Sequence, residues 1–152
     1  MKAITWLASF SVAAVAMTST ALAATQEGWT TDYESAVAQA KKENKSVLLE
    51  FTGSDWCPPC KLMQKNVFSK KEFVEAASKN FILVKLDFPR ADKAISEKNK
   101  PYAEKHEIQG YPTIILLDSA GKEFSRVVGA KYQSVDTFLE HINKALSNKD
   151  LD

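Results

Sequence analysis

Two cysteines, Cys57 and Cys60, are the only cysteines of the 152-residue chain, and two residues separate them. A short apolar run at 47–51 precedes them and an amphipathic stretch at 62–68 follows, which places the pair between a strand and the start of a helix. At this spacing one thiol can attack a disulfide and the other can resolve the product. The sequence therefore predicts a reversible dithiol/disulfide, with Cys57 exposed and Cys60 behind it.

The residues around the pair set its expected acidity. The positive end of a helix dipole stabilises a thiolate at Cys57, so its pKa should fall below the roughly 8.5 of a free cysteine. Pro58 and Pro59 suit the first helical positions, but they remove two backbone N–H groups that could solvate a thiolate. No histidine lies between the cysteines. We therefore expect a moderate lowering of the Cys57 pKa.

The first residues predict a secretory signal peptide at 1–23. Lys2 precedes an uncharged apolar stretch at 3–17, and small residues two apart, Ala21 and Ala23, form a cleavage site after Ala23. The alternative is an uncleaved membrane anchor, which the abundance of Ala, Ser and Thr disfavours. The mature chain, 24–152, is then one domain located in the periplasm or secreted.

Export matters because structural disulfides are common in oxidising compartments, so Cys57 and Cys60 could form a plain structural bridge. A bridge that encloses only two residues removes little entropy from the unfolded chain, which favours the redox interpretation. Loss of Lys2 leaves equal numbers of basic and acidic residues. This balance predicts no nucleic-acid binding and, after cleavage, no stable membrane insertion. We expect a monomer.

The remaining hydrophobic pattern alternates helices and strands. The predicted strands cover 46–51, 81–88, 113–117 and 123–128. The predicted helices cover 33–44, 62–68, 70–79, 89–110 with a break before Pro101, and 135–146. The last two strands form an antiparallel hairpin, and no strand is evident before Thr31. The fold class is therefore α/β, with a central mixed sheet of about four to five strands and helices on both faces. His106 and His141 are predicted to be exposed.

Four blocks in this order resemble the thioredoxin superfamily, and the resemblance covers nearly all of the mature chain. They are WCPPCK at 56–61, VKLD at 84–87, IQGYPT at 108–113, and Gly129 before the last helix. The loop at 51–57 looks most like that of exported thioredoxin-like proteins. The resemblance implies a thioredoxin-like fold.

The resemblance also implies roles for the residues around the cysteines. Cys57 would be the attacking thiolate and Cys60 the resolving thiol, with a Cys57–Cys60 disulfide in the oxidised form. Tyr111 and Pro112 would form a cis-proline loop that pairs with an extended substrate segment. From the residues alone, Pro112 would be an ordinary strand-start proline, because cis X-Pro bonds are a minority.

The substrate surface would also include Trp56, Pro58 and Pro59, although a simple packing role for Trp56 is the alternative. In many thioredoxins a buried acid beneath the second cysteine faces a lysine and helps to move its proton. Glu50 takes the place of the acid here, and Lys85 matches the lysine. The alternative is that both side chains point to solvent from strand edges. A carboxyl group in an apolar strand should have a raised pKa unless the lysine compensates.

The function that these residues predict is an exported thiol-disulfide oxidoreductase, of the protein-disulfide reductase type. Its partners would be protein disulfide or dithiol substrates and an upstream redox partner outside the cytoplasm. It would need no cofactor and no metal. The alternative is a protein that binds or delivers Cu(I) through the same dithiol. A zinc site needs four ligands, and Lys61 after Cys60 excludes the usual haem-attachment signature. A third possibility is a chaperone-like binding domain.

Overall fold

The strands form one mixed five-stranded sheet in the order β1-β3-β2-β4-β5. A computed structural model describes residues 26–149. Strands β1, β3 and β2 are parallel, whereas β4 is antiparallel to both β2 and β5. The strands are β1 (Trp29–Thr30), β2 (Ser46–Thr52), β3 (Phe81–Asp87), β4 (Thr113–Leu117) and β5 (Glu123–Val128). The predicted α/β class and mixed sheet are thus confirmed.

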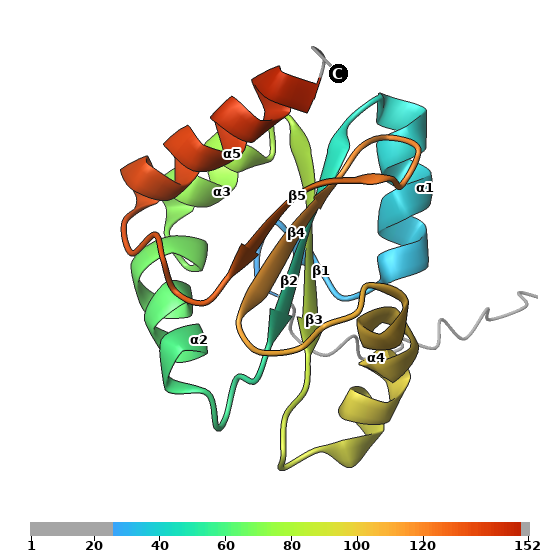
Figure 1. Cartoon of the computed structure of the whole chain (residues 1–152), viewed down its shortest axis with the longest axis vertical. Helices are drawn as coiled ribbons and strands as arrows, with labels where there is room; N and C mark the ends of the chain where they lie inside the picture. The colour runs from blue at the N-terminus through green and yellow to red at the C-terminus, as the bar shows by residue number, and fades with distance from the viewer. Residues whose placement is uncertain (1–25, 150–152) are drawn as a thin grey trace, which may run out of the picture.

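Helices cover both faces of this sheet (Figure 1). Helices α1 and α4 lie on one face, and α2, η1, α3 and α5 lie on the other. The helices are α1 (Tyr33–Glu43), α2 (Pro58–Met63), the π-helix η1 (Gln64–Phe68), α3 (Lys71–Ala77), α4 (Lys93–Lys105) and α5 (Val135–Lys149). None of the helices within residues 26–149 is long and apolar enough to cross a membrane.

Strand β2 is buried along its whole length, because it lies in the middle of a sheet that helices cover on both faces. Successive side chains of a strand point to opposite faces, so Leu48 packs with the α3 and α5 side and Leu49 with the α1 side. On the first side, Phe68, Phe73 and Phe138 are fully buried, and their ring centroids are 5.5 to 5.7 Å apart. These aromatic contacts hold the helices that follow the cysteines against the sheet.

One strand was not found from the sequence, and one local prediction is wrong. A two-residue strand, Trp29–Thr30, pairs with Leu83 and Val84 at the edge of the sheet, although no strand was predicted there. Helix α4 continues through Pro101 without the predicted break. Proline removes the bond to the carbonyl four residues earlier, and this is tolerated here because both Glu97 and Pro101 are exposed, where water can solvate that carbonyl.

Candidate active site

The two cysteines form a disulfide at the start of α2, with their Cα atoms 5.3 Å apart. Cys57 is the N-cap residue, and its Sγ accepts a hydrogen bond of 3.3 Å from the Cys60 N–H. Pro58 and Pro59 occupy the first helical positions, where a missing N–H breaks no intrahelical bond. The helix begins here because the Cys57 sulfur accepts a hydrogen bond from the Cys60 N–H, and the two prolines have no N–H group that needs a partner.

Both cysteines are buried in the disulfide form, with exposed fractions of 2% for Cys57 and 1% for Cys60. The prediction that Cys57 is exposed is therefore wrong for this form. The reason is the capping geometry, in which the Cys57 sulfur is bonded to Cys60 and faces the Cys60 amide instead of solvent. Pro58 and Pro59 are exposed beside it.

The loop before Cys57 is fastened to the segment that follows β3. Asp55 accepts hydrogen bonds from the N–H groups of Arg90 (3.1 Å) and Ala91 (2.9 Å). The bond from Ala91, followed by that from Arg90, holds the pKa of the Asp55 carboxyl below its usual range. Asp87 accepts a bond of 2.9 Å from the Ser54 N–H. These contacts fix the loop at the carboxyl ends of β2 and β3, where ligands usually meet an α/β sheet.

An aromatic group lies on this fastened loop. The Trp56 indole N–H donates to the Phe88 carbonyl at 2.8 Å, and the Trp56 ring contacts Tyr111 edge-on at a centroid distance of 5.7 Å. The Arg90 guanidinium lies 4.6 Å from the centre of the Trp56 ring. The peptide bond between Tyr111 and Pro112 is cis. Two of the predicted substrate residues, Trp56 and Tyr111, are thus brought into contact.

Glu50 is fully buried, and the hypothesis that it points to solvent is wrong. It pairs with Lys85 in the register of β2 and β3, and both side chains point to the face that α2 and η1 cover. Neither Glu50 carboxylate oxygen makes a hydrogen bond of full geometry, although the Thr52 side chain interacts with the carboxyl group. Burial raises the pKa of Glu50 to about 7, while the charge of Lys85 opposes this rise.

The Lys85 amine does not bond to this carboxyl group. Among residues 26–149 no ion pair joins Lys85 to Glu50, and the Lys85 Nζ instead donates to the Gln64 Oε1 at 3.1 Å. A cavity of about 170 Å³ lies beside them, and Thr52, Cys60 and Gln64 are among its lining residues. The resolving cysteine therefore adjoins a small cavity.

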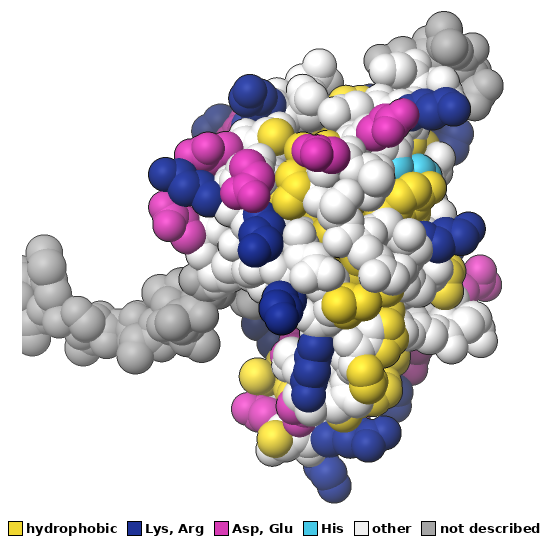
Figure 2. All heavy atoms as spheres, turned by 90° about the vertical axis from the view of Figure 1, so that its left-hand side faces the viewer, with side chains coloured by type: hydrophobic (Ala, Val, Ile, Leu, Met, Phe, Trp, Pro, Cys, Tyr) yellow, Lys and Arg dark blue, Asp and Glu magenta, His cyan; other side chains and the backbone are white. Residues whose placement is uncertain are grey.

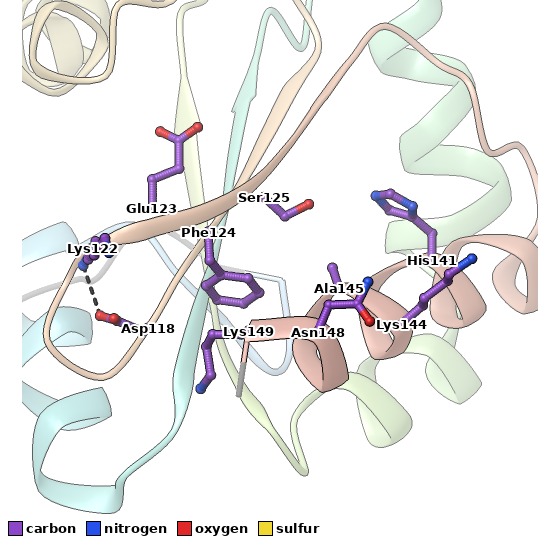
Figure 3. Close-up of a pocket in the computed structure, with 10 residues that line it drawn as sticks. All are labelled: Asp118, Lys122, Glu123, Phe124, Ser125, His141, Lys144, Ala145, Asn148 and Lys149. Carbon is purple, nitrogen blue, oxygen red and sulfur yellow. Dashed lines mark hydrogen bonds between the residues drawn. The ribbon is translucent and has the colours of Figure 1, made fainter. Parts of the chain in front are cut away.

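A larger cavity, of about 790 Å³, lies between β5 and α5. Figure 3 shows Glu123, Phe124 and Ser125 of β5 on one side of it and His141 on α5 on the other. It contains neither cysteine, so the redox group is not part of it. The surface formed by α2, α3 and α5 carries intermingled basic and acidic side chains (Figure 2).

The histidines do not have the exposed positions predicted for them. His106 is buried, and its Nε2 lies 3.2 Å from the Tyr33 hydroxyl. His141 is half-buried and stacks on Tyr132 at a centroid distance of 4.5 Å. Within the described part of the chain, no group of three or more His, Cys, Asp or Glu side chains could hold a metal ion.

Several residues of this site were missed from the sequence. Asp55, Asp87 and Arg90 fasten the loop, and Gln64 binds Lys85. A signal was present for two of them. Asp87 ends a strand that is parallel to the one before the cysteines, so both strands end at the same edge of the sheet. Gln64 lies four residues after Cys60, on the same helical face.

This chain is similar in sequence to a known protein family and to several characterised proteins. The family model described as Thioredoxin-like matches residues 28–119. The disulfide bond reductase DsbH of Chlamydia pneumoniae is 32% identical over 98 residues, which are 62% of this chain and 59% of DsbH. The thiol:disulfide interchange protein DsbD of Pseudoalteromonas atlantica is 32% identical over 117 residues, which are 76% of this chain and 18% of DsbD.

A solved structure, DsbH Oxidoreductase, superposes with a TM-score of 0.70 at 27% identity. The superposition covers 78% of this chain and 83% of that one. The chain spans less than two thirds of the length of the curated relatives named above.

Proposed function

This chain belongs to the thioredoxin-like family, and we propose that it is an exported thiol-disulfide oxidoreductase that reduces protein disulfides. The observation that carries the proposal is the Cys57–Cys60 disulfide at a helix start, on the sheet face that also holds the buried carboxyl group of Glu50. The names of two relatives, disulfide bond reductase DsbH and thiol:disulfide interchange protein DsbD, support the same reaction class.

In the first step, the Cys57 thiolate of the reduced protein attacks one sulfur of a substrate disulfide. A bond forms between the Cys57 Sγ and that sulfur, the substrate S–S bond breaks, and the other substrate sulfur leaves as a thiolate that takes a proton from solvent. The product is a mixed disulfide at Cys57. Trp56 and Tyr111, which are in contact, would face the substrate segment, and the Tyr111 backbone would pair with it.

In the second step, Cys60 resolves the mixed disulfide. Its thiol gives a proton to the Glu50 carboxylate, and the resulting thiolate attacks the Cys57 Sγ. The Cys57–Cys60 bond forms and the bond to the substrate breaks, so the substrate sulfur leaves as a thiolate that takes a proton from solvent, and Glu50 later returns its proton to solvent. The substrate has then gained two electrons and the protein is left oxidised. A carboxyl group whose pKa lies near 7 can both accept and return a proton near neutral pH. Lys85 would modulate that pKa through its charge.

The protein would be recharged by an upstream dithiol donor outside the cytoplasm, and no cofactor would be needed. The proposed export depends on cleavage of a signal peptide after Ala23, and this peptide lies outside the described residues. The direction of electron flow follows from the expected acidity of Cys57. Only the Cys60 N–H is hydrogen-bonded to its sulfur, and Pro58 and Pro59 offer no N–H, so a very stable thiolate is not expected.

Replacement of Cys60 with serine is expected to trap the mixed disulfide. Without a resolving thiol, the substrate stays attached to Cys57, because serine cannot attack a disulfide under these conditions. The reduced C60S protein is mixed with a disulfide-containing protein, quenched with acid, and analysed by mass spectrometry for a covalent adduct that dithiothreitol removes. The matched control is C57S, which keeps one thiol but should form little adduct. Equal adduct formation by both variants would contradict the assigned order of attack.

A further inference from the structure

Three polar side chains from distant parts of the sequence form a chain of hydrogen bonds below the cysteine helix. The Lys85 Nζ donates to the Gln64 Oε1 at 3.1 Å, and the Gln64 Nε2 donates to the Gln26 Oε1 at 2.6 Å. The Gln26 Nε2 then donates to the Phe68 carbonyl at 2.5 Å. In this series of hydrogen bonds, the side-chain amides of Gln26 and Gln64 each use both their oxygen and their nitrogen. The orientation of the Gln64 amide is therefore fixed from both sides.

Gln64 is also fixed relative to Cys60. It ends α2 and begins the π-helix η1, and its N–H donates to the carbonyls of Cys60 and Lys61. Short π-helical turns occur frequently at functional sites. The Gln64 side chain lines the cavity of about 170 Å³ together with Cys60 and Lys85. The residue is therefore attached directly to the helical turn that contains the resolving cysteine.

The charged groups around Glu50 are few. The charges of Lys85 and Asp87 act on Glu50 from β3. On the same strand as Glu50, the Thr52 side chain acts on its carboxyl group through hydrogen bonding, and the residue opposite Glu50 on β4 is the apolar Ile114. From the covering helices, Cys60, Lys61 and Lys65 line the cavity that Lys85 also lines. Lys85 is the cation paired with Glu50 in the strand register, yet its hydrogen bond goes to Gln64.

We propose that Gln64 is a positioning residue, whose amide oxygen anchors the Lys85 amine at the cavity and keeps it out of an ion pair with Glu50. The proposal rests on the proton transfer assigned to Glu50 above and adds the residue that controls it. If the amine were released, it would find in Glu50 a buried acceptor whose two oxygens make no hydrogen bond of full geometry and on which only the Thr52 side chain acts as a hydrogen-bond donor. An opposite charge at ion-pair distance favours the charged form of a carboxyl group. Glu50 would then lose its proton at lower pH.

The test is the titration of the Glu50 carboxyl by ¹³C NMR in the oxidised protein, where neither cysteine titrates. In Gln64→Met, which keeps the length of the side chain but lacks the amide, the Glu50 titration midpoint is expected to fall by about one pH unit or more. In Lys85→Met the midpoint is expected to rise, because the remaining cation is lost. The double variant with Gln64→Met and Lys85→Met should then have the same Glu50 midpoint as Lys85→Met alone.

A second variant protects the test against a folding failure at position 64. Gln26→Met releases the Gln64 amide from the other side and is expected to lower the Glu50 midpoint in the same direction by a smaller amount. The matched control is Gln39→Met, which removes an exposed amide that bonds to Glu43 on α1. It should leave the midpoint unchanged.

Two results would overturn the proposal. One is an unchanged or raised Glu50 midpoint in Gln64→Met, and the other is an equal fall in the presence and absence of Lys85. The titration needs no substrate and no turnover, so its outcome is separate from that of the proposed function. Unchanged exchange kinetics in Glu50→Gln would reject the proton transfer itself, even if the midpoint in Gln64→Met falls as expected.

Discussion

Replacement of Cys57 with serine is expected to abolish reduction of insulin disulfides, with a loss on the order of 10³-fold or more, as is usual when a covalent nucleophile is removed. The thiolate is the attacking species. The chain holds two cysteines, and the proposed mechanism makes Cys60 the resolving thiol, so C57S has no attacking thiol. The measurement is the rate of insulin precipitation with dithiothreitol as the electron donor, corrected for the donor alone.

The control for this experiment is a variant far from the disulfide. Lys144 is exposed on α5 and lines the cavity that contains neither cysteine, so K144A should reduce insulin at the wild-type rate. Full activity in C57S would contradict the proposed mechanism. It would favour the chaperone-like binding domain, in which the cysteines play no chemical part.

The second large effect is the pH dependence of stability that Glu50 causes. Its pKa is raised from 4.5 to about 7 by burial, so the folded state binds this proton more tightly than the unfolded state does. Stability is therefore lost as pH rises from 4.5 to 7, and the cost is complete above that range. The total loss in the free energy of unfolding is about 3 kcal/mol. Glu50→Gln removes the ionisable group, so its free energy of unfolding relative to wild type should rise by about this amount between about pH 4 and pH 8.

The measurement is urea unfolding of the oxidised protein and of the E50Q variant at both pH values. Burial also lowers the pKa of His106 and of His141, and this weakens the folded state in acid. Because both proteins contain these histidines, the difference between the two unfolding free energies isolates Glu50. A difference that stays constant with pH would mean that Glu50 has the same pKa in the folded and the unfolded protein, and this would contradict the raised pKa.

Much of the fold could be predicted from the sequence because its signals are strong and local. The strand at 46–51 is a continuous apolar run apart from Glu50, and the structure has it as β2 at the centre of the sheet. The hairpin of β4 and β5 follows from two apolar segments separated by a short polar turn. The pairing of Glu50 with Lys85 follows from the resemblance, and the register of β2 and β3 agrees with it.

The features that were missed depend on contacts between distant segments. The strand at Trp29–Thr30 is too short to show a period, and only its pairing with β3 identifies it. His106 lies in a polar helical context, yet its ring is buried against Tyr33 and Phe51, which are far away in the sequence. The bond between Lys85 and Gln64 depends on how the helix packs on the sheet. No local pattern encodes such contacts.

The central claim is that the Cys57–Cys60 pair transfers electrons to protein disulfides, and its equilibrium reduction potential is the most direct test. The oxidised protein is equilibrated in dithiothreitol and glutathione buffers of defined potential, and the fraction reduced is measured by thiol alkylation and mass spectrometry. The proposed reductase predicts a potential near roughly −270 mV, the value of thioredoxin. A potential near roughly −120 mV, which is typical of a strong oxidant, would contradict it.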